Sequence, residues 1–169
     1  MDVLEAIFTR RSIRKFTGEA IKDEDLKTLL KAGFQAPSAH NFQPREYVVV
    51  RDKEVIEKIT KFHKYSKMLP SAGCGIIVCG DTKKQPEIGF LVEDCSASIQ
   101  NILLAAHGLG LGAVWCGIYS VEKLTQSMSE TLNLPEHIIP IGMVVVGVKE
   151  EEKAAIDRYD ENKIHFDKW

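Results

Sequence analysis

The segment at residues 87–107 constrains the fold of this chain more than any other. Six apolar side chains recur there at helical spacing and cover a wide face: Leu91, Cys95, Ile99, Ile102, Leu103 and Ala106. A helix with so broad an apolar face is stable in water only when other elements cover it. Three glycines at positions 108, 110 and 112 then end the helix, and an apolar run over residues 113–118 predicts a strand. We therefore expect a layered fold built around one buried central helix.

The remaining apolar runs predict helices and strands in alternation along the chain. Further helices are expected at residues 3–10, 23–36, 53–59 and 121–132, with Asp2, Asp52 and Ser120 as N-terminal caps. Further strands are expected at residues 47–50, 74–79 and 141–148. A chain of 169 residues suffices for one core and is too short for two ordinary domains. The prediction is a single α/β domain, or an α+β domain if the sheet mixes parallel and antiparallel pairs.

Charge and hydropathy exclude several classes of partner. The 22 Lys and Arg residues are matched by 24 Asp and Glu residues, so the net charge of -2 produces no field that attracts nucleic acid or an anionic membrane. The longest apolar stretches are shorter than the roughly 20 residues that span a bilayer. No basic segment precedes an apolar run at the N-terminus, so we expect no secretory signal and a cytoplasmic protein.

Four cysteines and five histidines are scattered without the spacing of a metal site. The cysteines, at positions 74, 79, 95 and 116, lie among apolar neighbours in predicted strands or helices. We expect them to be reduced core residues and predict no metal ion.

A basic segment, Arg-Arg-Ser-Ile-Arg-Lys-Phe at residues 10–16, follows the first helix. In an extended chain, Arg10, Ser12 and Arg14 point to one side and Ile13 to the core. Guanidinium groups and a hydroxyl on one face suit a phosphorylated ligand, and a further arginine can face a carbonyl-rich ring edge. The alternative is a solvated basic turn.

Two further segments carry polar or small residues in loops. Residues 36–44 present the hydroxyl and amide groups of Ser38, Asn41 and Gln43 on a proline-stiffened loop, which suits the edge of a heteroaromatic ring or a polyol. The glycines at 108–112 follow a helix and precede a strand, the reverse of the order in a Rossmann dinucleotide fingerprint, so we reject that fold.

The C-terminal arm, residues 149–169, is highly charged up to residue 163 and then carries Ile164, Phe166 and Trp169. Its charged part cannot support a packed element of its own. We expect the arm to dock its apolar end on a surface, either of its own chain or of a partner subunit.

Together, and in this order, six motifs resemble the nitroreductase family of flavin enzymes. They are the basic segment, Ala-Pro-Ser-Ala-x-Asn-x-Gln-Pro at 36–44, Gln-Asn-Ile-Leu-Leu-Ala-Ala at 100–106, the Gly-Leu-Gly turn, Pro-Ile-Gly at 140–142 and Asp-Arg-Tyr-Asp at 157–160. The resemblance covers essentially the whole chain. It implies a single α+β domain at residues 1–169, with a central mixed sheet flanked by helices, and an intertwined homodimer with FMN in the subunit interface.

The resemblance also implies where the cofactor binds. Phosphate and ring contacts fall on Arg10, Arg11, Ser12, Arg14 and Arg158. The loop that reaches the flavin of the partner subunit carries Pro37, Ser38, Ala39, Asn41 and Gln43. The reactive edge of the ring passes Trp115, Cys116, Gly117 and Ile118. One position departs from the family: Arg45 stands where tryptophan is common.

The implied activity is that of an NADH- or NADPH-dependent oxidoreductase that reduces nitroaromatics, quinones or similar electron-poor acceptors by ping-pong hydride transfer. The flavin carries the chemistry, so no catalytic side chain is expected. Electrostatic reasoning assigns to Arg14 the stabilisation of charge on the reduced ring. Reductive dehalogenation or flavin fragmentation on the same scaffold, and a flavin-binding module with little turnover, remain as alternatives.

Overall fold

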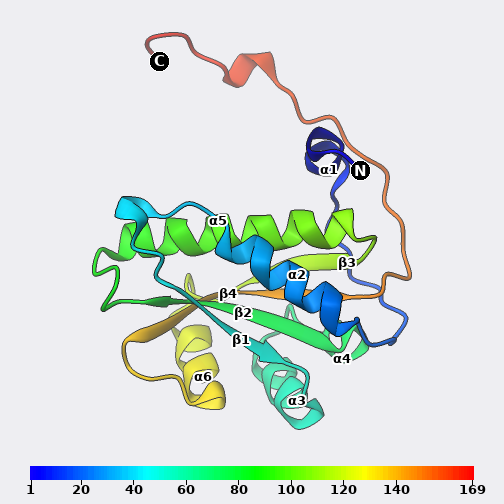
Figure 1. Ribbon diagram of the computed structural model, residues 1–169, viewed down its shortest axis with the longest axis vertical. Helices are drawn as coiled ribbons and strands as arrows, with labels where there is room; N and C mark the ends of the chain where they lie inside the picture. Colours follow the sequence, from blue (N-terminus) through cyan, green and yellow to red (C-terminus); the bar gives the residue numbers. More distant parts are fainter.

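A computed structural model describes residues 1–169 as helices packed on both faces of a four-stranded sheet (Figure 1). The strands are β1 (Arg45–Val50), β2 (Cys74–Asp81), β3 (Gly112–Gly117) and β4 (Ile138–Gly147), in the order β1-β2-β4-β3. This order makes β1 and β3 the two edges of the sheet.

Every neighbouring pair of strands is antiparallel. β2 and β3 run in the same direction and are connected through the long helix α5 (Ile88–Gly108), but β4 lies between them and runs the opposite way. The α+β class is confirmed, whereas the expectation of a mixed sheet was wrong. The two strands that could have formed a parallel pair are separated by the last strand of the chain.

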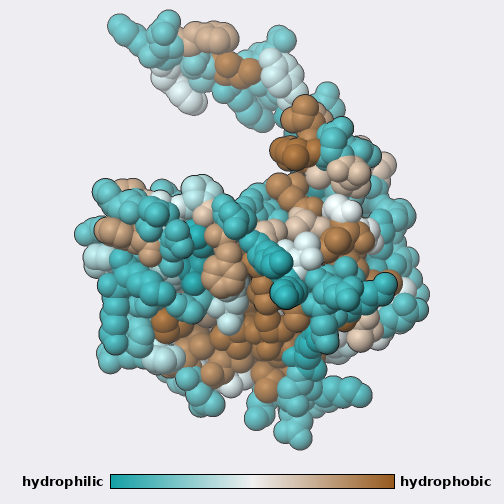
Figure 2. All heavy atoms as spheres, in the orientation of Figure 1, coloured by the Kyte–Doolittle hydropathy of each residue, from teal (hydrophilic) through white to brown (hydrophobic).

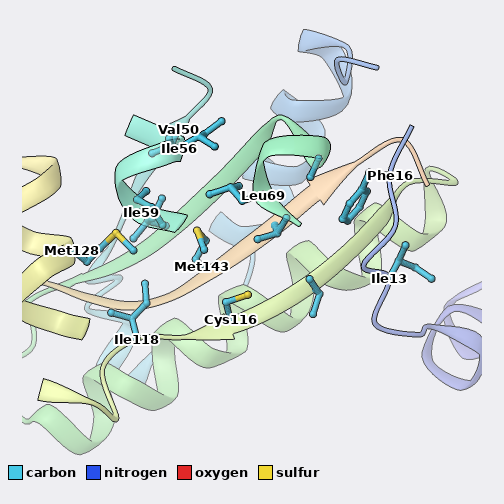
Figure 3. Close-up of a cluster of buried hydrophobic side chains, with 14 of the residues drawn as sticks. Ile13, Phe16, Val50, Ile56, Ile59, Leu69, Cys116, Ile118, Met128 and Met143 are labelled. Atoms are coloured by element: carbon cyan, nitrogen blue, oxygen red, sulfur yellow. The ribbon is translucent and has the colours of Figure 1, made fainter. Parts of the chain in front are cut away.

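The helices divide into two layers. α2 (Asp23–Phe34) and α5 cover one face, and α3 (Lys53–Phe62), α4 (Leu69–Ala72) and α6 (Glu122–Leu132) cover the other (Figure 1). Each layer encloses a cluster of 15 buried hydrophobic residues against the sheet. All eight residues of β2 are buried, because alternate side chains enter opposite clusters. Figure 3 shows the cluster beneath α3, α4 and α6, which Ile13 and Phe16 join from the basic segment.

The central helix is as the sequence predicted. The six apolar residues expected on its buried face are all at most 4% exposed. α5 is long and apolar enough by composition alone to cross a membrane, yet it contacts α2 and all four strands. The apolar face of α5 is therefore buried inside a folded domain, where α5 is the core helix.

The ends of the helices confirm two of three predicted caps. The side chain of Asp2 accepts from the backbone N–H of Glu5 (2.8 Å), and that of Asp52 accepts from Val55 (3.0 Å). Ser120 does not cap α6, because that helix begins two residues later and Val121 occupies the cap position without a side-chain bond. The sequence prediction also missed the short α4, which contains Pro70 in its first turn and ends at Gly73 with a φ of +73°.

Two segments stand apart from the core. α1 (Val3–Thr9) has no buried residue, so the predicted apolar stripe is exposed: Val3, Leu4, Ile7 and Phe8. The C-terminal arm crosses α1 and projects beyond it, and Ile164, Phe166 and Trp169 at its end are also exposed (Figures 1 and 2). Within one chain, no other element buries the apolar side chains of α1 or those at the end of the arm.

Tight packing of β4 on α4 generates a first prediction. A Cβ atom added at Gly147 would lie 2.7 Å from the backbone oxygen of Ala72 and 2.9 Å from its Cα. We expect Gly147→Ala to reduce the free energy of unfolding by about 1 to 3 kcal/mol, because backbone cannot move aside as a flexible side chain can. Urea unfolding measures this change.

Gly89→Ala is the control, since a Cβ there meets nothing within 4 Å. Its free energy of unfolding should equal that of the parent or exceed it by up to about 1 kcal/mol, because alanine is the better helix former. Equal effects of the two substitutions would contradict the packing seen between Gly147 and Ala72.

Candidate functional site

The basic segment is held extended along the edge of the sheet. The backbone N–H of Ile13 donates to the oxygen of Ala113 (3.0 Å), and Phe16 forms a β-bridge with Lys149. Ile13 and Phe16 are buried, at 6% and 4% exposed. Because Ile13 faces the core, its neighbours Ser12 and Arg14 point to the other side, as the sequence predicted, whereas the burial of Phe16 three residues later departs from strict alternation.

These residues line a pocket of about 240 Å³ that contains no carboxylate and no apolar side chain. Its walls are Arg10, Arg11, Ser12, Arg14, Lys153 and Arg158. Burial lowers the pKa of Arg10, and the nearby positive charges of Arg158 and Arg11 lower it further. The cations repel one another, so a bound anion with several oxygens would relieve the repulsion and satisfy their donors.

Arg11 lies between two pockets. It borders this cationic pocket, but it also borders a very small pocket on the side of His107, and its Nε atom is buried without a partner. His107 is bonded there to Thr9 (2.8 Å), which anchors the end of α1 to α5. Arg11 therefore contributes charge from the rear of the pocket.

The root of the C-terminal arm is fastened to the basic segment. Lys153 donates to the backbone oxygen of Ser12 (2.8 Å) and pairs with Glu151 (3.1 Å). Glu151 accepts the backbone N–H of Arg14 (2.7 Å), a bond that lowers the pKa of its carboxyl group. The sequence analysis did not select Lys153, because only the fold brings it beside a segment about 140 positions earlier.

A second pocket, of about 300 Å³, adjoins the first through Arg14. One wall is residues 114–117 of β3, and the other is the loop between α3 and α4, with Lys64, Tyr65, Lys67 and Met68. Trp115, at 39% exposed, and Tyr65 give it aromatic surface. Arg14 lines both pockets, so a cationic pocket and a flatter, partly apolar pocket lie next to each other. The two adjacent pockets together are called the groove.

The two walls of the second pocket are bonded to each other. Nε2 of His63 lies 3.0 Å from the backbone oxygen of Gly117, and the thiol of Cys116 donates to the oxygen of Tyr65 (3.4 Å). A carbonyl only accepts, so Nε2 of His63 carries the proton, and the Nδ1 atom is buried without a partner. The loop between α3 and α4 is therefore fixed relative to β3 by directional contacts.

The cysteines have the properties of core residues. All four are free and buried, as the sequence predicted. Burial raises the pKa of the Cys116 thiol to about 11, and it raises those of Cys79 and Cys95 to about 12. Cys116 is thus a neutral thiol near pH 7 and no nucleophile, although it lines the groove.

The sequence analysis did not predict that the loop between α3 and α4 lines this groove. Lys64, Tyr65, Lys67 and Met68 belong to no motif, and the only local signal is an aromatic residue between two lysines. Ile118 was expected beside the ring edge, but it is fully buried. It borders a neighbouring pocket of about 480 Å³ that shares Trp115 and Gly117 with the groove.

The predicted polar loop lies elsewhere. Residues 37–43 lead into β1, whereas the groove lies along β3, at the opposite edge of the sheet. Three strand spacings separate these edges by about 14 Å. In the loop, Ser38 accepts the backbone N–H of Gln43 (2.9 Å), and the amide of Gln43 donates to Asn41 (2.9 Å). One chain therefore does not bring Pro37, Ser38, Ala39, Asn41 and Gln43 to the groove.

Comparison with known proteins identifies relatives of this chain. A family model described as the nitroreductase family matches residues 7–66 and 63–148. A protein of Methanothermobacter thermautotrophicus, provisionally named an NADH dehydrogenase/NAD(P)H nitroreductase, is 44% identical over 169 residues, which cover 100% of this chain and 88% of that protein.

Solved structures show the same fold. One, from Bacteroides thetaiotaomicron and provisionally given the same name, has a TM-score of 0.94 at 37% identity, with 98% of this chain and 97% of that chain covered. Another, a provisionally named nitroreductase from Desulfovibrio desulfuricans in complex with FMN, has a TM-score of 0.85 at 28% identity, with 100% and 98% covered.

Proposed function

Because this chain belongs to the nitroreductase family and is an NAD(P)H-dependent flavin oxidoreductase with FMN as its cofactor, we propose that it reduces nitroaromatics, quinones or similar electron-poor acceptors by ping-pong hydride transfer. The cytoplasm, where nicotinamide donors are available, is the compartment of this proposal. The observation that carries the proposal is that a cationic pocket and a flatter aromatic pocket lie next to each other and share Arg14.

The residues of the groove fit FMN in their chemistry. A pocket with five cationic side chains and one hydroxyl suits a phosphate, which offers several oxygens to guanidinium forks. The adjoining slot, with Trp115, Tyr65 and the flat surface of β3, suits a planar ring. Arg10, Arg11, Ser12 and Arg158 would hold the phosphate, and Trp115, Cys116 and Gly117 would line the ring.

FMN, when bound, supplies a ring that accepts two electrons from a nicotinamide and gives them to an acceptor. Arg14 contributes electrostatics, since it lies where the two pockets meet and its positive charge favours negative charge on the ring. Burial keeps Cys116 a neutral thiol near pH 7, so it supplies no base for proton transfer. Lys64 and Lys67 add positive charge at the exposed rim.

A second copy of the chain would complete the site. Ile7 and Phe8, two of the exposed apolar residues of α1, border a pocket of about 730 Å³ with Gln100 of α5 and residues 155–159 of the arm. An apolar surface of this kind on a soluble domain favours burial against a partner. We place a second subunit there, in a homodimer whose polar loop, with Pro37, Ser38, Ala39, Asn41 and Gln43, reaches the flavin of the first subunit.

The domain assignment is part of the same proposal. Residues 1–169 form one FMN-binding domain, and residues 149–169 form an arm that docks on the partner subunit. The exposure of Ile164, Phe166 and Trp169 supports this role, because no surface of their own chain covers them.

The function is tested with the purified protein. Denaturation should release FMN, and NADH or NADPH should bleach the bound flavin without oxygen. Nitroaromatic and quinone acceptors should then restore the oxidised spectrum. Turnover only with halogenated aromatics, or cleavage of the flavin itself, would favour the other chemistries on this scaffold. A flavin that no nicotinamide reduces would identify a binding module and contradict the proposal.

Arg10 and Arg14 should have separable effects. Arg10→Ala removes a phosphate contact that is the same in both redox states, so it should weaken FMN binding by about 1.5 to 3 kcal/mol and leave the midpoint potential unchanged. Arg14→Ala removes positive charge beside the ring and should make the potential more negative; for a two-electron couple, about 30 mV corresponds to 1.4 kcal/mol.

Reductive titration of both variants, each saturated with FMN, makes this comparison. A potential that moves in Arg10→Ala and stays constant in Arg14→Ala would mean that the phosphate and ring ends of the groove are assigned in reverse.

The arm should affect assembly and cofactor binding separately. Deletion of residues 153–169 removes Lys153, Arg158 and the apolar end, so we expect a weaker dimer and lower FMN occupancy. Deletion of residues 164–169 alone retains both cations and should weaken only the dimer. Sedimentation and flavin absorbance measure the two quantities. A full-strength, flavin-saturated dimer from the longer deletion would rule out the role of the arm.

A further inference from the structure

Arg45 is a buried cation at the junction of α2, the polar loop and β1. It is only 3% exposed. Its Nη1 donates to the backbone oxygen of Pro37 (2.9 Å) and its Nη2 to that of Phe34 (3.2 Å). Phe34 is the last residue of α2, so the guanidinium group lies where the helix dipole favours a cation. One side chain thereby joins the end of a helix to the first residue of the loop.

Asp94 holds the same loop from α5. Its carboxyl group is buried, and Oδ1 accepts the backbone N–H of Ala39 (2.8 Å). Arg45 and Asp94 thus bind the backbone on either side of Ser38, one at the residue before it and one at the residue after it. Each also has one buried polar atom without a partner, Nε of Arg45 and Oδ2 of Asp94. Burying a charged group without a full set of partners costs free energy, so the rest of the fold must offset the burial of Arg45 and Asp94.

The loop has a backbone that needs such support. His40, Asn41 and Gln43 all have positive φ angles, of 52°, 57° and 47°. Side chains disfavour this conformation, and it persists where surrounding contacts impose it. Aromatic contacts of His40 with Phe42 and Phe90 hold the outer part of the loop. Only Arg45 and Asp94 bind the inner part by buried charge.

We propose that Arg45 and Asp94 are positioning residues that hold residues 37–43 in the shape with which this loop completes the cofactor pocket of the partner subunit. The inference rests on the proposed function, in which Ser38, Asn41 and Gln43 reach the partner's flavin. Arg45 and Asp94 lie behind the loop and act on the cofactor only through it. Loss of either contact should therefore change cofactor affinity without removing any group that touches the cofactor.

Arg51 supplies a matched control. It follows the other end of β1 and also joins a side chain to backbone, because it pairs with Asp23 (2.6 Å) and donates to the oxygen of Ile21 (3.3 Å). Both arginines thus connect the first strand to the region of α2. Arg51 makes no contact with the loop, so its loss tests the effect of general destabilisation alone.

The experiment compares Arg45→Met, Arg45→Lys and Arg51→Met in the full-length protein. Fluorescence quenching measures the Kd for FMN, and hydrogen exchange measures the protection of the Ala39 amide in the protein without FMN. Urea unfolding and the visible circular dichroism of the bound flavin complete the set. Arg45→Met should raise the Kd about tenfold, which corresponds to 1.4 kcal/mol, speed exchange at Ala39 and alter the flavin dichroism.

Arg45→Lys retains a donor for one carbonyl and should give intermediate values. Arg51→Met should lower stability and leave the Kd, the Ala39 exchange and the dichroism as in the parent. An Arg45→Met protein with the parent's Kd and exchange rate would overturn the inference and leave the proposed function intact. If that variant does not fold, parental values in Arg45→Lys would overturn it equally. A parent protein that binds no FMN would overturn the proposed function itself.

Discussion

The position of β4 between β2 and β3 is the constraint on which the site depends. α5 carries the chain across one face and leaves room for a further strand, so β3 becomes an edge while β1 becomes the other. The basic segment then pairs along β3 through Ile13, which turns Arg10, Ser12 and Arg14 outward beside that strand. The polar loop enters β1 at the opposite edge. Under the proposed function, a groove at one edge and a loop at the other would form one site only when two copies combine, and cofactor binding would then depend on assembly.

The charge distribution gives the groove its selectivity. The whole chain has a net charge of -2, yet five cations line one pocket. Mutual repulsion is visible at Arg10, whose pKa is lowered by burial, Arg158 and Arg11. A phosphate would relieve this repulsion, whereas a neutral ligand would not, so the pocket suits an anion although the whole chain has no overall attraction for polyanions. The arm contributes two of these cations, and any surface that holds the arm in place also completes the pocket.

The sequence predicted those parts of the fold that follow from local periodicity. The apolar face of α5, the buried run of β2 and the burial of Ile13 beside a pocket lined by Arg10, Ser12 and Arg14 are each readable within one segment, and each was confirmed. Strand order was not readable, because nothing local places β4 between β2 and β3. For the same reason Lys64, Tyr65, Lys67 and Lys153 were missed, since tertiary contacts alone bring them to the groove. The departure at Arg45 was visible in the sequence, but its partners, Pro37 and Phe34, were not.

Six of the seven buried polar residues of this domain lie near points where loops meet the core, and the seventh, Ser98 in the middle of α5, bonds to Tyr47. His63 and Ser66 are buried beside the loop between α3 and α4, Arg45 and Asp94 beside the polar loop, Asp81 at the end of β2 and Gln85 in the turn that follows it. Apolar packing permits small displacements at little cost, whereas a hydrogen bond weakens steeply once its angle or distance changes. Aliphatic side chains therefore suffice between the helix layers and the sheet, where they need only fill space. Loops that contact a ligand need a fixed direction as well as a fixed place, and directional bonds from buried groups such as His63 to Gly117 and Arg45 to Pro37 supply both.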